Sequence, residues 1–332
     1  MSAAAPPLSV VIPTYNRLPH LRRVLDGLAR QEGLAHPLEV VVVDDGSTDG
    51  TDEWLRSRHV PLPIIAHTQP NRGPAAARNT GVAACSGDLV LFVDDDVVPH
   101  PHLVQAHLRH HAGADDKVVI GPMNTPDDVE LSAWTRWEQK QLDKQYSALT
   151  AGEWPVTPRQ FYTGNASLAR RHIESAGGFD PTFRRAEDVE LAFRLADDGL
   201  HFAFAPDAVV VHYAPRSFGA WRSNAAEYGR NDVIFGRDHG RTWLLDSVYG
   251  EFHGRHRLTR MLTTASLRLP KMRPSLIAVL AGVARATNRL RLRSVADAAL
   301  SALYNVEYYH GMADELGGEA ALRSRLAKAA RP

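Results

Sequence analysis

The segment Asp88-Leu-Val-Leu-Phe-Val-Asp-Asp-Asp96 sets an apolar run directly before three consecutive aspartates. A short aliphatic and aromatic run of this kind is typical of a parallel strand that is covered on both faces. A second run, Leu38-Glu-Val-Val-Val-Val43, ends in Asp44-Asp45. Ligands of open α/β sheets bind beyond the carboxyl ends of the strands. The two segments therefore predict a parallel sheet with carboxylates gathered at one edge.

The residues around these segments alternate between strand and helix patterns. An apolar run at 9–13 predicts a first strand, and apolar residues recur at helical spacing from Leu18. Asn71-Arg-Gly-Pro74 precedes an alanine-rich helix, with proline near its first position. Further strands are expected at 117–120, 201–205 and 208–213, with a helix at about 187–196. This order predicts an α/β domain with a mainly parallel sheet over residues 1–215.

The remaining residues, 216–332, lack strand patterns and predict a helical C-terminal region with breaks at Pro270 and Pro274. Residues 252–296 contain no acid but ten Arg and Lys residues among Leu, Ile and Val. Such a pattern favours a membrane-surface helix or a site for an anionic acceptor. A solvated helix that pairs with acids elsewhere in the chain is the alternative, and the sequence leaves it open.

Composition restricts the partners and the compartment. The formal net charge of the 332 residues is zero, so we expect no nucleic-acid partner. The single cysteine, Cys85, cannot form an internal disulfide or a site built on several thiolates. The sequence shows no signal peptide, and its apolar runs are shorter than the ~20 residues that span a membrane. We expect a cytoplasmic protein, with peripheral contact at the inner face of the membrane through residues 252–296.

The aspartate run at 94–96 predicts a metal site. Adjacent carboxylates repel one another unless a cation or hydrogen-bond donors lie between them. Their oxygens are the ligands that Mg²⁺ and Mn²⁺ prefer, and such ions share their coordination shell with substrate phosphates. Turn formation or helix capping is the alternative, and it suits Asp44–Thr48 better than the triple aspartate.

Seven motifs occur in one order along residues 8–215. The motifs are Val10-Val-Ile-Pro-Thr-Tyr-Asn-Arg17, Val43-Asp-Asp-Gly-Ser-Thr-Asp49, Gly73-Pro-Ala-Ala-Ala-Arg-Asn79, Phe92-Val-Asp-Asp-Asp96, Gly164-Asn165, Gly177-Gly-Phe-Asp180 and Ala186-Glu-Asp-Val-Glu-Leu-Ala-Phe-Arg194. In this order and spacing the chain resembles family 2 glycosyltransferases, which have the A-type fold of nucleotide-diphospho-sugar transferases, a single Rossmann-like domain.

The resemblance implies transfer of a sugar from a nucleotide-diphosphate donor, with UDP as the default nucleotide, to an acceptor hydroxyl. Asp45, with Asp44 as the near alternative, would accept a hydrogen bond from the base. Arg78 would meet the base or the diphosphate. The donor residues that the resemblance implies are Pro13, Thr14, Tyr15, Arg17, Asp44, Asp45, Gly73, Arg78, Asp94 and Asp95.

The same resemblance implies a bound Mn²⁺ or Mg²⁺. Asp94 and Asp96 match the outer positions of the family's Asp-x-Asp motif, in which one carboxylate holds the ribose and the other the metal. His212 follows a predicted strand, and some relatives supply a histidine here as a third metal ligand. A lone histidine is more often structural, so that alternative stays open.

Catalysis is expected at Glu187 and Asp188. In inverting relatives a carboxylate at this place takes the proton from the attacking hydroxyl, and Asp188 is implied as that general base. A predicted helix begins here, and its dipole favours the ionised form of an acid in the first turn. The alternative is that both acids only complement this helix N-terminus.

The sequence identifies residues that would bind the acceptor less specifically than those that would bind the donor. Gly164 allows close backbone approach, and with Asn165 it is implied to contact the acceptor. Trp134 and Trp137 are further candidates because aromatic side chains stack on sugar rings, although core packing explains them equally well. The acceptor itself is left open as a glycan, a lipid-linked or cell-surface precursor, or a small molecule.

Two competing functions stay open. A nucleotidyltransferase on a similar sheet would show a glycine-rich basic loop after the first strand, where this chain has Pro-Thr-Tyr-Asn-Arg17. A non-catalytic sugar-nucleotide-binding protein would have no need of Asp94, Asp96 and Asp188. The Gly-x-Gly-x-x-Gly pattern of dinucleotide folds does not follow the first strand, and the sequence has no phosphate-binding P-loop motif.

Overall fold

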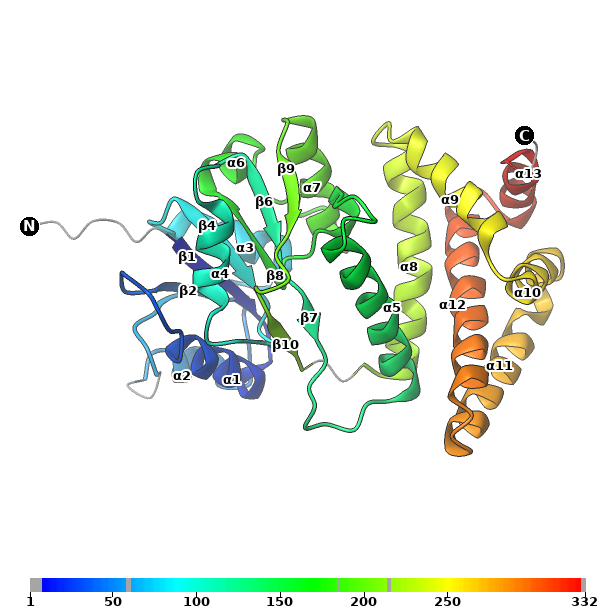
Figure 1. Ribbon diagram of the computed structural model, residues 1–332, viewed down its shortest axis with the longest axis horizontal. Coiled ribbons are helices and arrows are strands. Elements are labelled where there is room, and N and C mark those ends of the chain that lie inside the picture. Colours follow the sequence, from blue (N-terminus) through cyan, green and yellow to red (C-terminus); the bar gives the residue numbers. More distant parts are fainter. Residues whose placement is uncertain (1–7, 58–60, 184, 214–215, 330–332) are drawn as a thin grey trace, which may run out of the picture. The chain divides into compact units, whose positions relative to one another are not determined.

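The computed structural model describes residues 8–57, 61–183, 185–213 and 216–329 (Figure 1). The chain divides into two compact units, one of residues 1–129 and 142–214, the other of residues 130–141 and 215–332. Residues 130–141 lie before the predicted boundary at residue 215 but belong to the second unit. They include the first half of one long helix, α5 (Ala133–Thr150).

The first unit is built on a seven-stranded sheet in the order β3-β2-β1-β4-β8-β6-β9. β1 pairs in parallel with β2 and β4, which confirms the predicted parallel sheet. β8 runs antiparallel to both of its neighbours, β4 and β6. The bounds of the strands are β1 (Leu8–Thr14), β2 (Glu39–Asp44), β3 (Ile65–Thr68), β4 (Leu89–Val93), β5 (Val97–Pro99), β6 (Lys117–Ile120), β7 (Met123–Asn124), β8 (Asn165–Ala169), β9 (His201–Phe204) and β10 (Val210–His212).

A second, three-stranded sheet in the order β5-β10-β7 positions His212. β10 runs antiparallel to β5, and the register pairs His212 with Val97. The Tyr213 backbone N–H donates to the carbonyl oxygen of Asp96 at 2.7 Å. The chain that follows the aspartate run is thereby tied to the chain around His212.

Both faces of the main sheet are covered by helices, as the apolar strands predicted. Val10 and Ile12 of β1 pack in one cluster with residues of α1 and α4, whereas Val11 packs in another with residues of α3 and α7. Alternate side chains of one strand thus enter different layers of the core. The helices of this unit, besides the second half of α5, are α1 (Leu18–Ala29), α2 (Thr51–Leu55), α3 (Pro74–Ala84), α4 (Leu103–His111), α6 (Arg170–Ser175) and α7 (Glu187–Asp197).

The second unit is helical, as predicted for residues 216–332. A short 3₁₀ turn at Pro270–Met272 separates α10 from α11, where the prolines predicted a break. Among the described residues, no helix is long and apolar enough to span a membrane. The helices are the first half of α5, then α8 (Phe218–Arg237), α9 (Thr242–Gly254), α10 (Arg257–Arg268), α11 (Arg273–Arg289), α12 (Arg293–Glu315) and α13 (Glu319–Ala329).

Two glycines bring α8 and α12 into close contact (Figure 1). A Cβ atom at Gly229 would lie 2.0 Å from the Tyr308 carbonyl oxygen, and one at Gly311 would lie 2.0 Å from that of Ala226. Both neighbours are backbone atoms, which cannot swing away as a flexible side chain can. The crossing of these two helices therefore depends on the absence of a side chain at both positions.

We predict that Gly311→Ala lowers the free energy of unfolding by about 1–3 kcal/mol, because the added methyl group overpacks the α8–α12 contact. Gly250→Ala is the matched control, since Gly250 also lies in a helix but has no neighbouring atom within 4 Å of the methyl group that alanine would add. The control should be neutral or stabilising by about 0.5–1 kcal/mol. Urea denaturation measures both, and equal effects of the two changes would contradict the close-contact account.

Candidate active site

One buried arginine joins the aspartate run to the acidic helix α7. Arg78 donates from Nη2 to Asp94 Oδ1 at 2.8 Å and from Nη1 to Glu187 Oε1 at 2.7 Å. Its guanidinium also lies 5.7 Å from the centre of the Phe179 ring. The planar guanidinium presents donors in a fixed fork, so it fixes both carboxylates at once. The carboxyl end of β4 and the N-terminus of α7 therefore meet at Arg78.

Asp188 lies next to this ion-pair network. Its Oδ1 accepts a hydrogen bond from the Val189 backbone N–H at 2.8 Å. Burial and the neighbouring Glu187 carboxylate raise the pKa of Asp188 to about 7, although Arg78 opposes the shift. A carboxyl group with a pKa near neutrality can both accept and release a proton there. The geometry is compatible with the predicted general base.

The backbone that leads into α7 is strained. Ala186 precedes the helix in the left-handed conformation, with φ of 61°. A non-glycine residue in this conformation costs free energy and persists only where the surrounding structure holds it, often at functional sites. Here it lies directly before Glu187 and Asp188. Alanine gives no sequence signal for such a conformation, so this feature could not be predicted.

Arg17 binds the other two aspartates of the run. Its Nη1 donates to Asp95 Oδ1 at 3.2 Å and to Asp96 Oδ2 at 2.5 Å. Asp95 also accepts a hydrogen bond from Thr14 Oγ1 at 2.8 Å. Burial raises the pKa of Asp95 to about 7, against the opposing effect of Arg17. Two arginines from different elements thus neutralise the three carboxylates.

Asp96 also lies close to His212. Nε2 of His212 is 3.5 Å from Asp96 Oδ1. Although burial opposes ionisation, the hydrogen bond and charge of His212, together with Arg17, lower the pKa of Asp96 to about 2. Asp96 is therefore ionised at neutral pH. The predicted proximity of a carboxylate and a histidine is present in the structure.

The residues around Asp96 can be tested against a divalent cation. A carboxylate oxygen and an imidazole nitrogen are ligands that suit Mn²⁺. Asp94 instead faces Arg78, and within the described parts of the chain no three His, Cys, Asp or Glu side chains converge as a metal site. The chain thus offers two donors, Asp96 and His212. This set fits an ion that takes its other ligands from phosphate oxygens and water.

The Asp45 carboxylate binds the loop that precedes α3. One oxygen accepts from Gln69 Nε2 at 2.7 Å, and the other accepts from the Gly73 backbone N–H at 2.8 Å. The Arg72 backbone N–H donates to the same carboxylate. These bonds fix the loop that leads into α3, and so position Arg78. Asp44 is buried and accepts from the Ser47 backbone N–H at 2.9 Å, as in a turn.

The loop after β1 presents an exposed aromatic ring. Tyr15 is 48% exposed, whereas Thr14 before it is buried and Pro13 is half-buried. Asn16 follows in the left-handed conformation, and its side chain accepts from the Thr48 backbone N–H at 2.7 Å. Of the donor residues Pro13, Thr14 and Tyr15, Tyr15 is the one whose side chain is exposed.

Gly164 lies against Asp94. A Cβ atom there would come within 3.2 Å of Asp94 Oδ2 and 2.7 Å of Met123 Sδ. The side chain of the next residue, Asn165, binds groups of the protein itself. It is fully buried, its Nδ2 donates to the Ala208 carbonyl oxygen at 2.7 Å, and its Oδ1 lies 2.9 Å from His107 Nε2.

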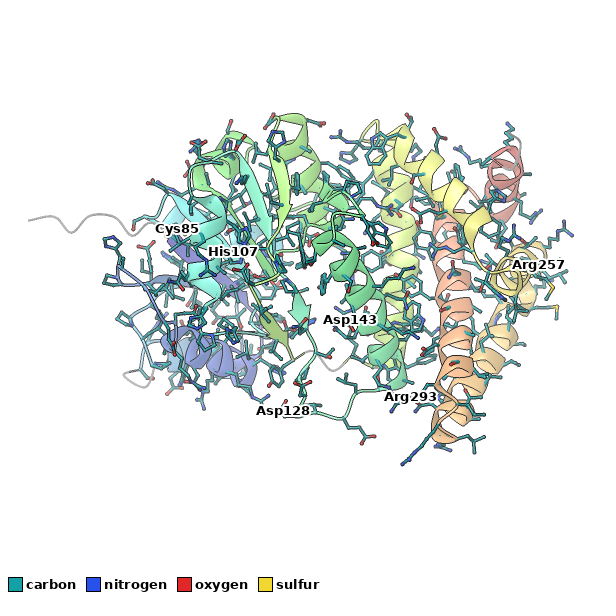
Figure 2. The ribbon with its side chains drawn as sticks, in the orientation of Figure 1. Cys85, His107, Asp128, Asp143, Arg257 and Arg293 are labelled. Carbon is teal, nitrogen blue, oxygen red and sulfur yellow. The ribbon has the colours of Figure 1, made fainter. Side chains whose placement is uncertain are left out.

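His107 completes a buried polar network that the sequence did not reveal. Its Nδ1 lies 2.7 Å from Ser167 Oγ, which also lies 2.8 Å from His111 Nε2. Burial lowers the pKa of His107 to about 4, so the ring is neutral. The network joins α4 to β8, and Figure 2 labels His107 in the first unit. A lone histidine on a helix carries no sequence signal for this role.

The two tryptophans predicted for the acceptor pack in the core of the second unit. Trp137 is buried, donates from Nε1 to Ser301 Oγ at 2.8 Å, and packs edge-on against Trp221. Trp134 donates from Nε1 to the Arg216 carbonyl oxygen at 2.8 Å and packs against Phe218. Their indole groups hold α5, α8 and α12 together, which is the core-packing alternative.

The chain is similar to known proteins over much of its length. The profile of the family described as "Glycosyl transferase family 2" matches residues 9–175. The chain is 33% identical over 230 residues to the pre-mycofactocin glycosyltransferase of Mycobacterium tuberculosis, covering 67% of this chain and 46% of that protein. It is 37% identical over 224 residues to the validoxylamine A glucosyltransferase of Streptomyces hygroscopicus subsp. jinggangensis, covering 59% of this chain and 52% of that one. The chain thus spans about half the length of these relatives.

Solved structures share the fold. The mannosyltransferase PcManGT of Pyrobaculum calidifontis, in complex with GDP-Man and Mn²⁺, aligns with a TM-score of 0.56 at 22% identity, over 91% of this chain and 86% of that one. S. aureus TarS in complex with UDP-GlcNAc aligns with a TM-score of 0.54 at 19% identity, over 91% and 90%. At these identities the likeness shows the fold alone, and it confirms the predicted A-type fold.

We predict that Arg78→Gln lowers the free energy of unfolding by about 3–5 kcal/mol, because it leaves the Asp94 and Glu187 carboxylates without their buried cation. Arg56→Gln is the matched control, since the Arg56 side chain is 70% exposed and pairs with Asp52 within one turn. The control should change stability by less than about 0.5 kcal/mol. Chemical denaturation measures both, and a cost below about 1 kcal/mol for Arg78→Gln would contradict a structural ion-pair network.

Proposed function

The chain belongs to glycosyl transferase family 2, and from this premise we propose that it transfers a sugar from a nucleotide-diphosphate donor to an acceptor hydroxyl with inversion at the anomeric carbon. The proposed donor is a UDP-sugar, and the proposed cofactor is Mn²⁺ or Mg²⁺. The observation that carries the proposal is the Arg78 network. It sets a proton acceptor, Asp188, next to the carboxylates at the end of β4.

Asp188 is the proposed general base. The attacking hydroxyl of the acceptor must lose its proton as the new glycosidic bond forms. A base works best when its pKa lies near the working pH, because it is then ionised and yet a strong enough acceptor. Burial and Glu187 raise the pKa of Asp188 to about 7, which meets this condition. Arg78 limits the shift, so that Asp188 still ionises near neutrality.

Asp96 and His212 are the proposed residues that would hold the metal ion. When bound, the ion neutralises the negative charge of the leaving diphosphate. The short separation of Asp96 Oδ1 and His212 Nε2 supports this assignment, as does the ionised state of Asp96. Arg17, whose guanidinium now binds Asp96, is a second cation within reach of a diphosphate. One solved relative, PcManGT, is in complex with GDP-Man and Mn²⁺.

The remaining donor residues form the proposed nucleoside side. Tyr15 would stack on the base, because its ring is exposed at the end of β1. Asp94 and Gly164 lie against each other, so the sugar and the acceptor would meet beside the Arg78 network. A UDP-sugar is proposed over a GDP-sugar on family frequency, and the TarS relative was solved with UDP-GlcNAc.

Inversion is proposed because of the carboxylates near the site that are available as a base or a nucleophile. A retaining double displacement needs a nucleophile that attacks the anomeric carbon as well as an acid or base. Asp94 and Glu187 are held by Arg78, whereas Asp95 and Asp96 are held by Arg17. Asp188 is left as the carboxylate beside this network without an arginine ion pair among the described residues. One base suits a single displacement.

We predict that the protein releases nucleoside diphosphate from one member of a panel of UDP-, GDP- and dTDP-sugars with Mn²⁺, and that EDTA abolishes the release. Asp96→Ala should lower turnover at least a hundredfold and weaken donor binding in Mn²⁺, because it removes a metal ligand. Asp115→Ala, which removes an exposed carboxylate, is the control and should leave turnover unchanged. Full activity in excess EDTA would contradict the proposed dependence on a metal ion.

The same reaction reveals the stereochemical course. With an α-linked donor sugar, the transferred sugar should carry the β configuration, read from the anomeric proton coupling by NMR. A product that retains the donor's configuration would refute the single displacement. Retention would leave the family assignment intact but would require a nucleophile that the proposal does not contain.

A further inference from the structure

The second unit exposes a turn in which leucine and arginine alternate. Residues 289–293 read Arg-Leu-Arg-Leu-Arg and connect α11 to α12. Leu290 is 69% exposed and Leu292 is 51% exposed, and the three arginines between and around them are exposed too. Exposing two large apolar side chains at the tip of a turn is costly in water. Their position suggests that a partner covers them.

These arginines carry charge that the protein does not neutralise. Across residues 252–296, Arg273 pairs with Glu307, Arg255 pairs with Glu251, and Arg285 lies over the Phe218 ring. These three cations therefore have a structural explanation. Within the described residues, no ion pair is formed by the seven others, which are the half-buried Arg260 and the exposed Arg257, Arg268, Lys271, Arg289, Arg291 and Arg293.

A basic pocket adjoins the turn. It has a volume of about 280 Å³ and is lined by Asn288, Arg293, Ser294, Arg136 and Lys140, among others. Lys140 pairs with Asp297, which also lines the pocket, whereas Arg136 donates to Asn288 Oδ1 and the Leu131 carbonyl oxygen. Among the described residues, neither Arg136 nor Arg293 forms an ion pair. The pocket opens at the first turn of α12, whose dipole adds to the attraction for an anion.

A second apolar stripe extends the surface along α10. Leu258 and Met261 lie in α10, Leu269 and Met272 lie in the turn that follows it, and all four are about half exposed or more. Arg257, Arg268 and Lys271 flank them. α10 and α11 both pack against α12, and Figure 1 shows both on the side of α12 away from α8. Figure 2 labels Arg257 beside α10 and Arg293 at the lower end of α12, so the α10 residues and the 289–293 turn lie at opposite ends of α11.

We propose that this surface docks on an anionic lipid bilayer, with Leu290 and Leu292 inserted at the level of the headgroups and the unpaired arginines bound to lipid phosphates. Interfacial binding requires apolar side chains next to cations. The leucines would enter the boundary of the acyl chains, while the arginines would bind the anionic headgroups. The pocket at Arg136 and Arg293 takes one headgroup phosphate. The inference does not depend on the proposed transferase activity.

Charge favours this occupant over a second copy of the chain. A symmetric dimer brings the same patch of both copies together. Arg289, Arg291 and Arg293 of one copy would then face the same residues of the other, and the nearest acid in the sequence, Asp297, already pairs with Lys140. A bilayer with anionic lipids offers negative charge over a wide area instead.

Vesicle flotation of the full chain tests the proposal. The protein should float with vesicles of 70% phosphatidylcholine and 30% phosphatidylglycerol at 50 mM salt. It should stay in the soluble fraction with pure phosphatidylcholine, and 0.5 M salt should release it because the charges are screened. Failure to float with the anionic vesicles at low salt would overturn the proposal.

Variants separate charge from insertion. Replacing Arg289, Arg291 and Arg293 with Gln should weaken partitioning roughly a hundredfold, since each cation near the surface contributes a factor of about five. The control replaces three exposed cations of the first unit, Arg30, Arg56 and Lys144, with Gln, and should partition as the wild type does. Equal losses for the two triple variants would mean that only net charge matters, and the assigned surface would be wrong.

Replacing the two leucines tests insertion independently of charge. Leu290→Ser together with Leu292→Ser should weaken partitioning about tenfold without changing the net charge, because insertion is lost. Circular dichroism and thermal melting check that each variant folds, since all altered side chains are exposed. A concentration-dependent dimer that this double variant abolishes, seen by sedimentation velocity without lipid, would identify the surface as a protein interface and overturn the proposal.

Discussion

The site depends on one ion-pair geometry, the fork of Arg78 between Asp94 and Glu187. The two carboxylates come from segments almost a hundred residues apart, the end of β4 and the start of α7, and the buried Glu187 needs a cation beside it. The guanidinium is held in turn by the position of α3. Asp45 fixes that helix's first residues through hydrogen bonds to the 69–73 loop. The ion pairs of Arg78, a residue of α3, thus connect the end of β4 with the N-terminus of α7.

The same compensation explains why three adjacent aspartates are tolerated. Arg78 binds Asp94, and Arg17 binds Asp95 and Asp96, so each carboxylate has a cation even without a metal ion. A diphosphate with a divalent ion would compete with Arg17 for Asp96. The second unit has a different organisation, in which Gly229 and Gly311 allow α8 and α12 to pack closely and aromatic side chains fill the core. Its unpaired charge is confined to the surface of α10 to α12.

Much of the fold could be predicted because burial leaves a pattern in the sequence. The runs that end at Val43 and Val93 are strands, and their aspartates gather at one sheet edge, as covered parallel strands require. The antiparallel course of β8 was not predicted, since its sequence, Asn-Ala-Ser-Leu-Ala169, has no apolar run. The family resemblance also implied Arg78, Asp96 and His212 as site residues, and the structure places Arg78 against Asp94 and His212 close to Asp96. Their partners depend on tertiary contacts that no local pattern encodes.

The individual roles were harder to predict for the same physical reason. Asn165 and Asp45 are polar residues in motifs, yet their side chains satisfy buried backbone groups. Trp134 and Trp137 are of a residue type that often stacks on sugar rings, but they pack against Phe218 and Trp221 in an aromatic core. The sequence shows that a side chain is polar or aromatic, but it does not show whether that side chain contacts a ligand or other groups of the protein. The burial and the contacts of the side chain, which the structure gives, distinguish the two.

The proposed mechanism depends on Asp188 as a base, whose pKa burial and Glu187 raise to about 7. The most direct test is the pH dependence of donor turnover from pH 5 to 9 for the wild type and for Asp188→Asn. Because the base must be ionised, wild-type turnover should fall about tenfold per pH unit below pH 7 and level off above it. Asp188→Asn should keep its donor affinity, lose at least a hundredfold in turnover, and show no such acid limb. A variant that retains most of its turnover with the same acid limb would contradict the account.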